Sequence, residues 1–235
     1  MRQLQFNGAP ISIESASAIR SLLCHEIQTK ARFFPVVTYN VSMIGLHSPP
    51  LFKWLCEHAL FVPDGIGISI GLLARYFCWV SRYPGIDLAN DLLQHNSGWR
   101  VALIGASPKV IDAVYDQFRL SYSQHEVCFH RHGYASFTSD DYAQLAAALP
   151  DLILVAMGCP QQDIMIHQMA SVLPSGVAIG VGGAFDVWSG YKQRAPIYLR
   201  RLGFEWAYRL VLEPSRIPRL VRAFIRLFGG HSRNF

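Results

Sequence analysis

The sequence predicts an α/β fold in which a mostly parallel sheet carries helices on both faces. Short apolar runs alternate along the 235 residues with longer segments of helical periodicity. The runs at 101–105, 152–156 and 177–181 are apolar throughout, with Val or Ile in each. They lack alternating polar residues, which is typical of parallel strands buried on both sides. A chain of this length is sufficient to bury one large core.

In the first half of the chain, a helix is expected over 14–30 because Ile19 and Ile27 fall on its apolar side. The runs PVVTYN and LFVP are short and apolar, so buried strands are expected at 35–40 and 60–63. The segments that follow are expected as helices at 65–76 and 86–95.

In the second half, strands and helices alternate in the same way. Strands are expected at 100–105, 126–130, 151–158 and 176–183. Helices are expected at 108–118, 139–149 and 161–173. Thr138 is a candidate N-cap for the second of these helices, and Pro160 suits the start of the third.

Composition and cysteine usage indicate the type of compartment. Hydrophobic residues make up 51% of the chain and charged residues 16%, which excludes a disordered protein. The five cysteines are scattered and form no CxxC pair, so a reducing cytosol is expected. No apolar run of signal-peptide type follows Arg2, and no window of about 18 apolar residues predicts a spanning helix.

Charge divides the chain into two parts. Residues 1–191 carry 11 Lys and Arg against 14 Asp and Glu, a balance of −3, whereas residues 192–235 carry 10 against 2, a balance of +8. We therefore predict an α/β catalytic domain at 1–195 and a basic appendage at 196–235 with a polyanionic target.

The appendage contains a basic amphipathic helix. At 100° per residue, Arg216, Arg219, Arg222 and Arg226 of segment 216–228 fall on one side and apolar residues on the other. This pattern is typical of a helix lying in a membrane interface, and we expect 215–228 to bind an anionic membrane surface. The alternative is a terminal helix that packs its apolar side on the protein's own core.

Polar residues at the ends of predicted strands are the candidates for chemistry, because ligands bind beyond the carboxyl ends of parallel strands. Asp64 follows the strand at 60–63 and precedes Gly65, where it is placed to accept a proton or, alternatively, to cap a helix. Thr38 and Asn40 point to one side of their strand. They are candidates for holding a sugar or, alternatively, for local turn hydrogen bonds.

Two later segments are candidates for nucleotide binding. GCPQQD at 158–163 opens a helix whose free amides attract phosphate or sugar hydroxyls, and GVGGAFD at 180–186 exposes glycine backbone beside an acid. The sequence contains no Walker A, HExxH, GxSxG or DxD pattern. His125, Cys128, His130 and His132 do not match zinc-site spacing, so no metal site and no cofactor are expected.

Seven ordered stretches resemble the WecG/TagA/CpsF family of bacterial glycosyltransferases over about residues 33–226. They are VTYNV (37–41), PDGIG (63–67), RYPGIDL (82–88), LIGASPKVI (103–111), MGCPQQD (157–163), GVGGAFDVWSGYKQRAP (180–196) and LGFEWAYRLVLEPSRIPR (202–219). The resemblance implies a Rossmann-like body, an inverting and metal-independent transfer, and a UDP-sugar donor. The implied acceptor is a GlcNAc-diphospho-polyprenol, and the implied donor sugar is N-acetylmannosamine or its uronic acid, with UDP-glucose or another UDP-hexose as the alternative donor.

The resemblance also implies roles for residues. Asp64 is similar to the family's base, and Thr38, Asn40 and Arg82 to groups that hold the acceptor or the sugar. Gln162 and Asp186 match positions that face the nucleotide-sugar pocket. The appendage arginines, which would neutralise the diphosphate, correspond to Arg209, Arg216 and Arg219.

Four departures from the family pattern leave the donor open. Cys159 stands in place of Ser, Gln161 in place of Lys or Arg, Asp163 in place of Glu, and Pro84 in place of a small or β-branched residue.

The expected protein is therefore a hexosyltransferase of bacterial surface polysaccharide synthesis, held at the inner face of the plasma membrane, with homo-oligomerisation left open. Two other classes are alternatives. A nucleotide-binding oxidoreductase would need a fuller GxGxxG fingerprint than GIGISIG. A basic-tailed module for nucleic acid would interleave aromatics with its charges, whereas this tail separates apolar from basic residues, so no nucleic-acid partner is expected.

Overall fold

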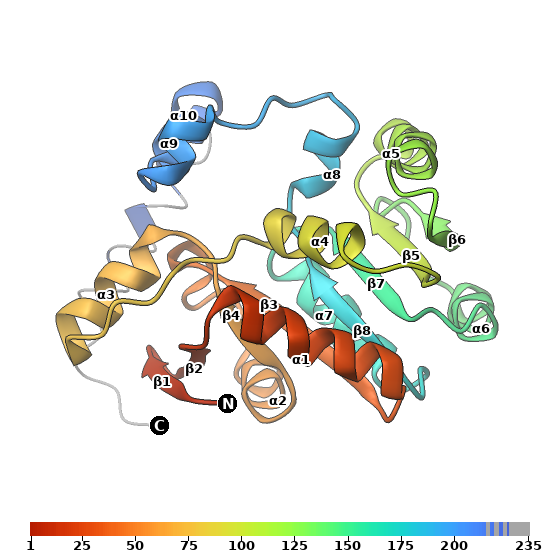
Figure 1. The fold of residues 1–235 in the computed structure, drawn as a ribbon, viewed down its shortest axis with the longest axis horizontal. Coiled ribbons are helices and arrows are strands. Elements are labelled where there is room, and N and C mark those ends of the chain that lie inside the picture. Colours follow the sequence, from red (N-terminus) through yellow and green to blue (C-terminus); the bar gives the residue numbers. More distant parts are fainter. Residues whose placement is uncertain (215–216, 219–220, 223–224, 226–235) are drawn as a thin grey trace.

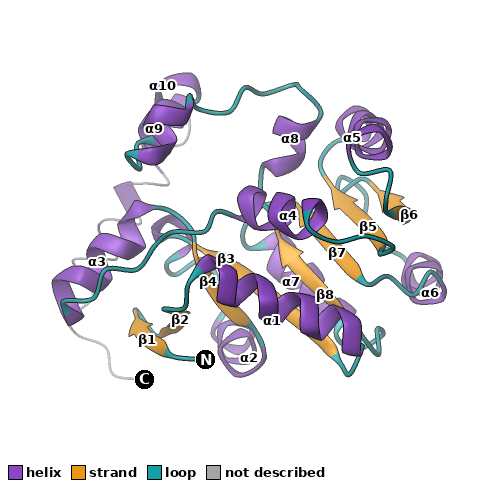
Figure 2. Ribbon diagram, viewed as in Figure 1, coloured by secondary structure: helices purple, strands orange, loops and turns teal. Residues whose placement is uncertain are grey.

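The computed structural model describes residues 1–214, 217–218, 221–222 and 225. An eight-stranded sheet of order β1-β2-β4-β3-β8-β7-β5-β6 crosses the molecule (Figures 1 and 2). Its strands are β1 (Gln3–Phe6), β2 (Ala9–Ser12), β3 (Phe33–Tyr39), β4 (Leu60–Pro63), β5 (Arg100–Gly105), β6 (Glu126–Arg131), β7 (Leu152–Ala156) and β8 (Gly176–Gly180). Every neighbouring pair is parallel except the β1–β2 hairpin, which confirms the predicted mostly parallel sheet.

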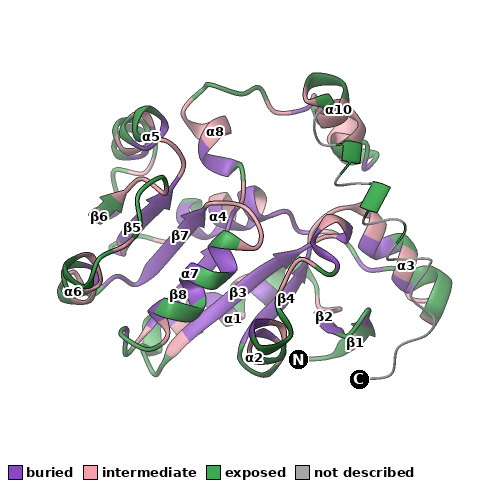
Figure 3. Ribbon diagram, turned by 180° about the vertical axis from the view of Figure 1, so that it is seen from behind, coloured by how far each residue is buried: buried purple, intermediate pink, exposed green. Residues whose placement is uncertain are grey.

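Helices cover both faces of the sheet, as predicted. The α-helices are α1 (Ala16–Thr29), α2 (Pro49–His58), α3 (Ile66–Tyr76), α4 (Gly85–Gln94), α5 (Pro108–Ser121), α6 (Ser139–Ala147), α7 (Gln161–Met169), α8 (Ala184–Trp188), α9 (Ile197–Arg201) and α10 (Glu205–Leu212). One face packs against α1, α4, α5 and α8, and the other against α2, α6 and α7. The view from behind shows the second group, with the buried strands beneath it (Figure 3).

All the predicted strands and helices of the body are present, with ends that differ by a few residues. Thr138 is the N-cap of α6, and its side chain accepts a hydrogen bond from the Asp141 amide. The β1–β2 hairpin and helices α2 and α8 were not predicted. Asn7 and Gly8 connect the two strands with φ angles of 48° and 81°. An Asn-Gly pair between two strands is a known hairpin signal, and the sequence contains it.

The carboxyl edge of the sheet brings together the predicted segments. The Asp64 amide donates to the Tyr39 carbonyl over 2.8 Å, which extends the β3–β4 pairing beyond the last strand residues. The Tyr83 amide donates to the Pro63 carbonyl over 2.7 Å, so the loop that carries Arg82 is tied to the end of β4. This edge is where ligands bind in parallel α/β sheets.

The chain after residue 195 folds over this edge. Gly203, between α9 and α10, adopts a φ of 83°, and a Cβ atom here would lie 3.0 Å from Ile66 at the start of α3. The predicted appendage therefore rests beside the strand end that carries Asp64. Among the residues that the structure describes, no helix combines the length and apolar character needed to cross a membrane.

Candidate active site

Asp64 lies between β4 and α3 and is half-buried. Gly65, with a φ of 95°, is the N-cap of α3, and no side chain caps that helix. A positive φ favours glycine at this position. The structure therefore does not support the alternative interpretation of Asp64 as a helix cap, and its carboxyl group is left to interact with its surroundings.

Burial raises the pKa of Asp64 to about 6. Arg209 opposes this effect, Glu205 adds to it, and Asn40 and Arg82 lower the pKa again. An acid with a pKa near 6 is deprotonated at neutral pH and is a stronger base than an ordinary carboxylate. The structure thus brings Asp64, Asn40, Arg82 and Arg209 into one electrostatic neighbourhood, although they come from four separate segments of the chain.

Asn40 interacts with the Asp64 carboxyl group and is itself held by local hydrogen bonds. Its side-chain oxygen accepts from the Ser42 amide over 3.1 Å and from the Ser42 hydroxyl over 2.5 Å. These bonds cap the short 3-10 helix η1 (Val41–Met43), and the Asn40 side chain also hydrogen-bonds to Asp64. Local turn bonding and a polar contact with the candidate base are therefore both present at Asn40. Its contact with a sugar stays a prediction.

Thr38 ties two strands together below the site. Its hydroxyl donates to the Gly180 carbonyl over 2.7 Å, and the residue is 5% exposed. A Cβ atom at Gly85 would lie 3.1 Å from this hydroxyl oxygen, so the start of α4 approaches Thr38 closely. Thr38 positions β3, β8 and α4 at the carboxyl edge, and its contact with a substrate stays a prediction.

Gln162 supports the glycine-rich segment that follows β8. Its Oε1 accepts from the Gly182 amide over 3.0 Å, and its side-chain amide fills the space that a Cβ at Gly180 would need. Because Gln162 is 3% exposed, it contacts this backbone from beneath. Its role toward the nucleotide sugar stays a prediction.

Asp186 is ion-paired. The Lys192 ammonium lies 2.9 Å from Asp186 and 3.1 Å from Glu213, so it connects α8 to the chain beyond α10. Asp186 therefore lies in a contact between the body and the appendage. Arg216 and Arg219 lie outside the described residues, and their proposed contacts with a diphosphate stay predictions.

Sequence reasoning missed a chain of ion pairs beside Asp64. Arg194 binds Asp87 with both terminal nitrogens, each over 2.6 Å, and its Nε lies 3.8 Å from Glu205. Glu205 in turn pairs with Arg209 over 2.6 Å. Asp87, Arg194 and Glu205 all fall inside the stretches that resemble the family. Their position inside those stretches was the one indication in the sequence that they could belong to the site.

One side-chain group in the described part of the chain has the composition of a metal site. His47 Nε2 lies 2.9 Å from Asp163 Oδ2 and 3.5 Å from Cys159 Sγ, and each residue offers a ligand atom within 4.8 Å of the others. The same contacts can also be purely structural, because they connect the loop between β3 and α2 to the start of α7 through buried hydrogen bonds. His125, one of the four residues whose spacing does not match a zinc site, hydrogen-bonds to the Leu93 carbonyl and the Trp99 amide.

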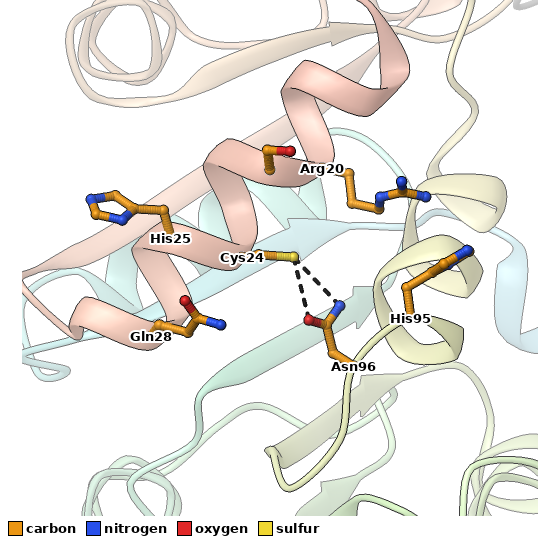
Figure 4. A pocket seen from close by; sticks show the side chains of 7 residues that line it. Arg20, Cys24, His25, Gln28, His95 and Asn96 are labelled. Carbon is orange, nitrogen blue, oxygen red and sulfur yellow. Dashed lines mark hydrogen bonds between the residues drawn. The ribbon is translucent and has the colours of Figure 1, made fainter.

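A separate pocket of about 370 Å³ lies between α1 and the end of α4, lined by Arg20, Cys24, His25, Gln28, His95 and Asn96 together with Ser21 (Figure 4). Cys24 Sγ and the Asn96 amide contact each other there over 3.4 Å. None of the residues predicted for the site lines this pocket. The candidate residues for acid–base chemistry lie at the carboxyl edge of the sheet and not in this pocket.

The fold and site define a class: a parallel α/β enzyme with a raised-pKa carboxylate and arginines at the carboxyl edge of its sheet. The sequence profile of the glycosyl transferase WecG/TagA/CpsF family matches residues 4–233, and the chain belongs to that family. It is a glycosyltransferase, which excludes the oxidoreductase and the nucleic-acid module considered above.

Curated relatives carry more specific names. The chain is 33% identical over 187 residues to an N-acetylglucosaminyldiphosphoundecaprenol N-acetyl-beta-D-mannosaminyltransferase of Bacillus subtilis (strain 168), covering 79% of this chain and 73% of the relative. Proteins of the same name from Bacillus spizizenii (strain ATCC 23059 / NRRL B-14472 / W23) and Staphylococcus aureus (strain NCTC 8325 / PS 47) are 30% and 28% identical. The alignments cover 85% and 91% of this chain, and 80% and 89% of the relatives.

Proposed function

We propose that this glycosyltransferase moves N-acetylmannosamine, or its uronic acid, from a UDP-sugar to a GlcNAc-diphospho-polyprenol in bacterial surface polysaccharide synthesis. The observation that carries the proposal is Asp64, a carboxylate of pKa about 6 beside Arg209 and Arg82. The names of the relatives support the lipid-linked acceptor and the transferred sugar.

The reaction is a single displacement. The acceptor hydroxyl, O4 of GlcNAc in this proposal, attacks the anomeric carbon of the donor while the bond from that carbon to the β-phosphate oxygen breaks. Asp64 takes the proton of the hydroxyl, and UDP leaves with the electron pair. Inversion of an α-linked donor produces a β-linked product, which agrees with the beta linkage in the relatives' names. General-base assistance of this kind contributes about 10²–10⁴-fold.

The leaving group needs positive charge. Arg209 is an arginine of the described appendage that acts on Asp64, and Arg216 and Arg219 are the further arginines of this proposal. Guanidinium groups form paired, charge-assisted bonds with phosphate and stabilise the developing charge without a metal. Thr38, Asn40 and Arg82 are assigned to the acceptor or the sugar, and Gln162 and Asp186 to the donor side.

Peripheral membrane attachment brings the enzyme to its lipid acceptor. Exposed apolar side chains are numerous on the described appendage and on neighbouring α3: Ile70, Leu73, Phe77, Ile197, Tyr198, Leu202, Phe204, Trp206, Val211 and Leu212. Phe77 is 92% exposed and Trp79 56%. Aromatic side chains beside arginines are typical of membrane interfaces. We assign this surface, with segment 215–228, to the inner face of the plasma membrane. Of that segment, only 217–218, 221–222 and 225 are among the described residues.

The decisive experiment is a donor panel. Purified protein is incubated with a short-chain GlcNAc-diphosphate lipid and with UDP-N-acetylmannosamine, its uronic acid, UDP-glucose and UDP-GlcNAc, and products are identified by mass spectrometry. The proposal predicts transfer from one of the first two donors and a β linkage by NMR. Transfer from UDP-glucose alone would leave the family assignment intact but refute the proposed sugar. An Asp64→Asn variant is the matched inactive control.

A further inference from the structure

The Glu205 carboxylate occupies a position in which a phosphate would be expected. It lies 2.6 Å from Arg209 and 3.8 Å from Arg194 Nε, and its side chain is 12% exposed. Arg194 is fixed from the other side by its two bonds to Asp87, so its guanidinium is held in one orientation. Two guanidinium groups that converge on one anion form the usual recognition geometry for phosphate oxygens.

Arg194 has an unused donor in this arrangement. Its side chain is 14% exposed, and its Nε is buried without a hydrogen-bond partner among the described residues. The 3.8 Å separation from Glu205 is an ion-pair distance but is too long for a hydrogen bond. A buried donor without a partner is costly, so this N–H indicates an acceptor that Glu205 replaces only in part.

The charges are already balanced without a substrate. Three guanidinium groups and three carboxylates interact here within the described residues: Arg82, Arg194, Arg209, Asp64, Asp87 and Glu205. A nucleotide diphosphate that bound here would bring a negative charge on each phosphate, and the group of side chains and ligand would then carry an excess of negative charge. Removing one carboxylate from contact with the arginines would offset part of that excess.

We propose that Glu205 is an internal stand-in for a substrate phosphate, which Arg194 and Arg209 exchange for a phosphate of the donor when it binds. No covalent step is involved: the carboxylate leaves the two guanidinium groups and a phosphate oxygen takes its place. Arg194 thereby gains a partner for Nε, and Arg209 is released from its intrahelical pair. The inference rests on the proposed UDP-sugar donor. It adds Arg194 and Glu205, which neither the sequence nor the resemblance had assigned.

The test compares UDP with uridine as calorimetric probes of the full chain. Glu205→Gln keeps the side-chain shape but removes the competing charge, so UDP should bind about tenfold more tightly, a change within the range of one charge-assisted bond. Uridine carries no phosphate, and its affinity should not change. Arg194→Lys keeps the charge but loses the planar fork, and should weaken UDP binding about tenfold.

Glu126→Gln is the matched control, because Glu126 pairs with Arg100 over 2.8 Å at edge strand β6, outside the site. It should bind UDP as the wild type does, and melting curves confirm that each variant is folded. Equal or weaker UDP binding by Glu205→Gln would overturn the exchange and leave Glu205 as a residue that positions Arg209. If the wild type itself does not bind UDP, the proposed donor class is wrong and the exchange fails with it.

Discussion

Replacing Asp64 with Asn should have opposite effects on activity and on stability. Asn matches the shape of the carboxyl group but accepts no proton, so turnover should fall by about 10²–10⁴-fold. Stability should change in the other direction, because folding places the charged carboxylate in an unfavourable, partly dehydrated position. This combination separates a catalytic loss from an unfolded variant.

The magnitude follows from the pKa. Asp64 has a pKa of about 6 in the folded protein against a reference value of 3.8, a difference of roughly two units. At about 1.36 kcal/mol per unit, the ionised carboxylate costs the fold about 3 kcal/mol at most. Because the group is only half-buried, solvent screening makes the real cost smaller. This shift already includes the favourable effects of Arg209, Asn40 and Arg82.

The sign of the pH dependence is fixed by the direction of the shift. Since the folded pKa is raised, the protonated carboxyl favours folding, and this advantage is complete below about pH 3.8 and lost as the pH rises through 6. The neutral amide of the Asp64→Asn variant carries no such penalty. The variant should therefore melt several degrees higher than wild type at pH 8, and the gain should shrink toward pH 4.

Melting temperatures and free energies of unfolding from pH 4 to 8 test this, with the exposed α5 residue in Asp116→Asn as control. An Asp64→Asn protein that is no more stable than wild type at pH 8 would refute the dehydration argument. Activity above about a tenth of wild type would exclude a 10²-fold role as base.

Four further predictions concern the leaving group, the glycine-rich segment after β8 and the membrane. Transfer should persist in excess EDTA, and a loss restored by Mg²⁺ or Mn²⁺ would contradict the arginine-based mechanism. Gln162→Ala should leave the Gly182 amide without its partner, lower stability by about 1–3 kcal/mol in denaturant titrations and reduce affinity for UDP. Arg209→Ala should lose about tenfold to a hundredfold in transfer to a soluble acceptor yet still float with anionic liposomes. A combined Val211→Ser and Leu212→Ser variant, changed at exposed positions, should keep its transfer activity on the soluble acceptor but no longer float with anionic liposomes.

The sheet was predictable because its strands are buried on both faces. A segment such as β7 has apolar side chains on both sides, and every one of its residues is buried, so short-range pattern and final environment agree. The β1–β2 hairpin was not predicted because its strands have only four residues each, too few to show a clear alternation of apolar and polar residues. Its Asn7-Gly8 turn was the stronger signal, since both residues adopt the positive φ angles that such a turn requires.

From the residue pattern alone, candidate site residues could be found only at the ends of predicted strands, whereas Arg82 and Arg209 were found through the family resemblance. Asp64, Thr38 and Asn40 stand at strand ends, and parallel strands end at a common edge. Arg194 and Asp87 are 107 residues apart, and no local pattern reports that they form two hydrogen bonds. The raised pKa of Asp64 was equally hidden, because it depends on burial and on charges that α10 brings from elsewhere in the chain.

Helix α10 combines two properties: it carries charges that act on the candidate base, and it carries exposed apolar side chains. The predicted boundary at residue 195 assigned catalysis to the part of the chain before α10 and membrane binding to the part that contains it. This helix carries Arg209 and Glu205, which act on Asp64 with opposite sign, and also Val211, which is 79% exposed. Membrane binding through the apolar side chains of this helix would also affect the positions of Arg209 and Glu205, because all these residues share one helical backbone. If α10 binds the bilayer, this one contact places Arg209 and Glu205 beside Asp64 and also brings the site to the lipid acceptor. Activity on a soluble acceptor should then rise when anionic liposomes are added to wild type. It should not rise for the Val211→Ser and Leu212→Ser protein, and equal stimulation of both proteins would show that the bilayer acts through another part of the chain.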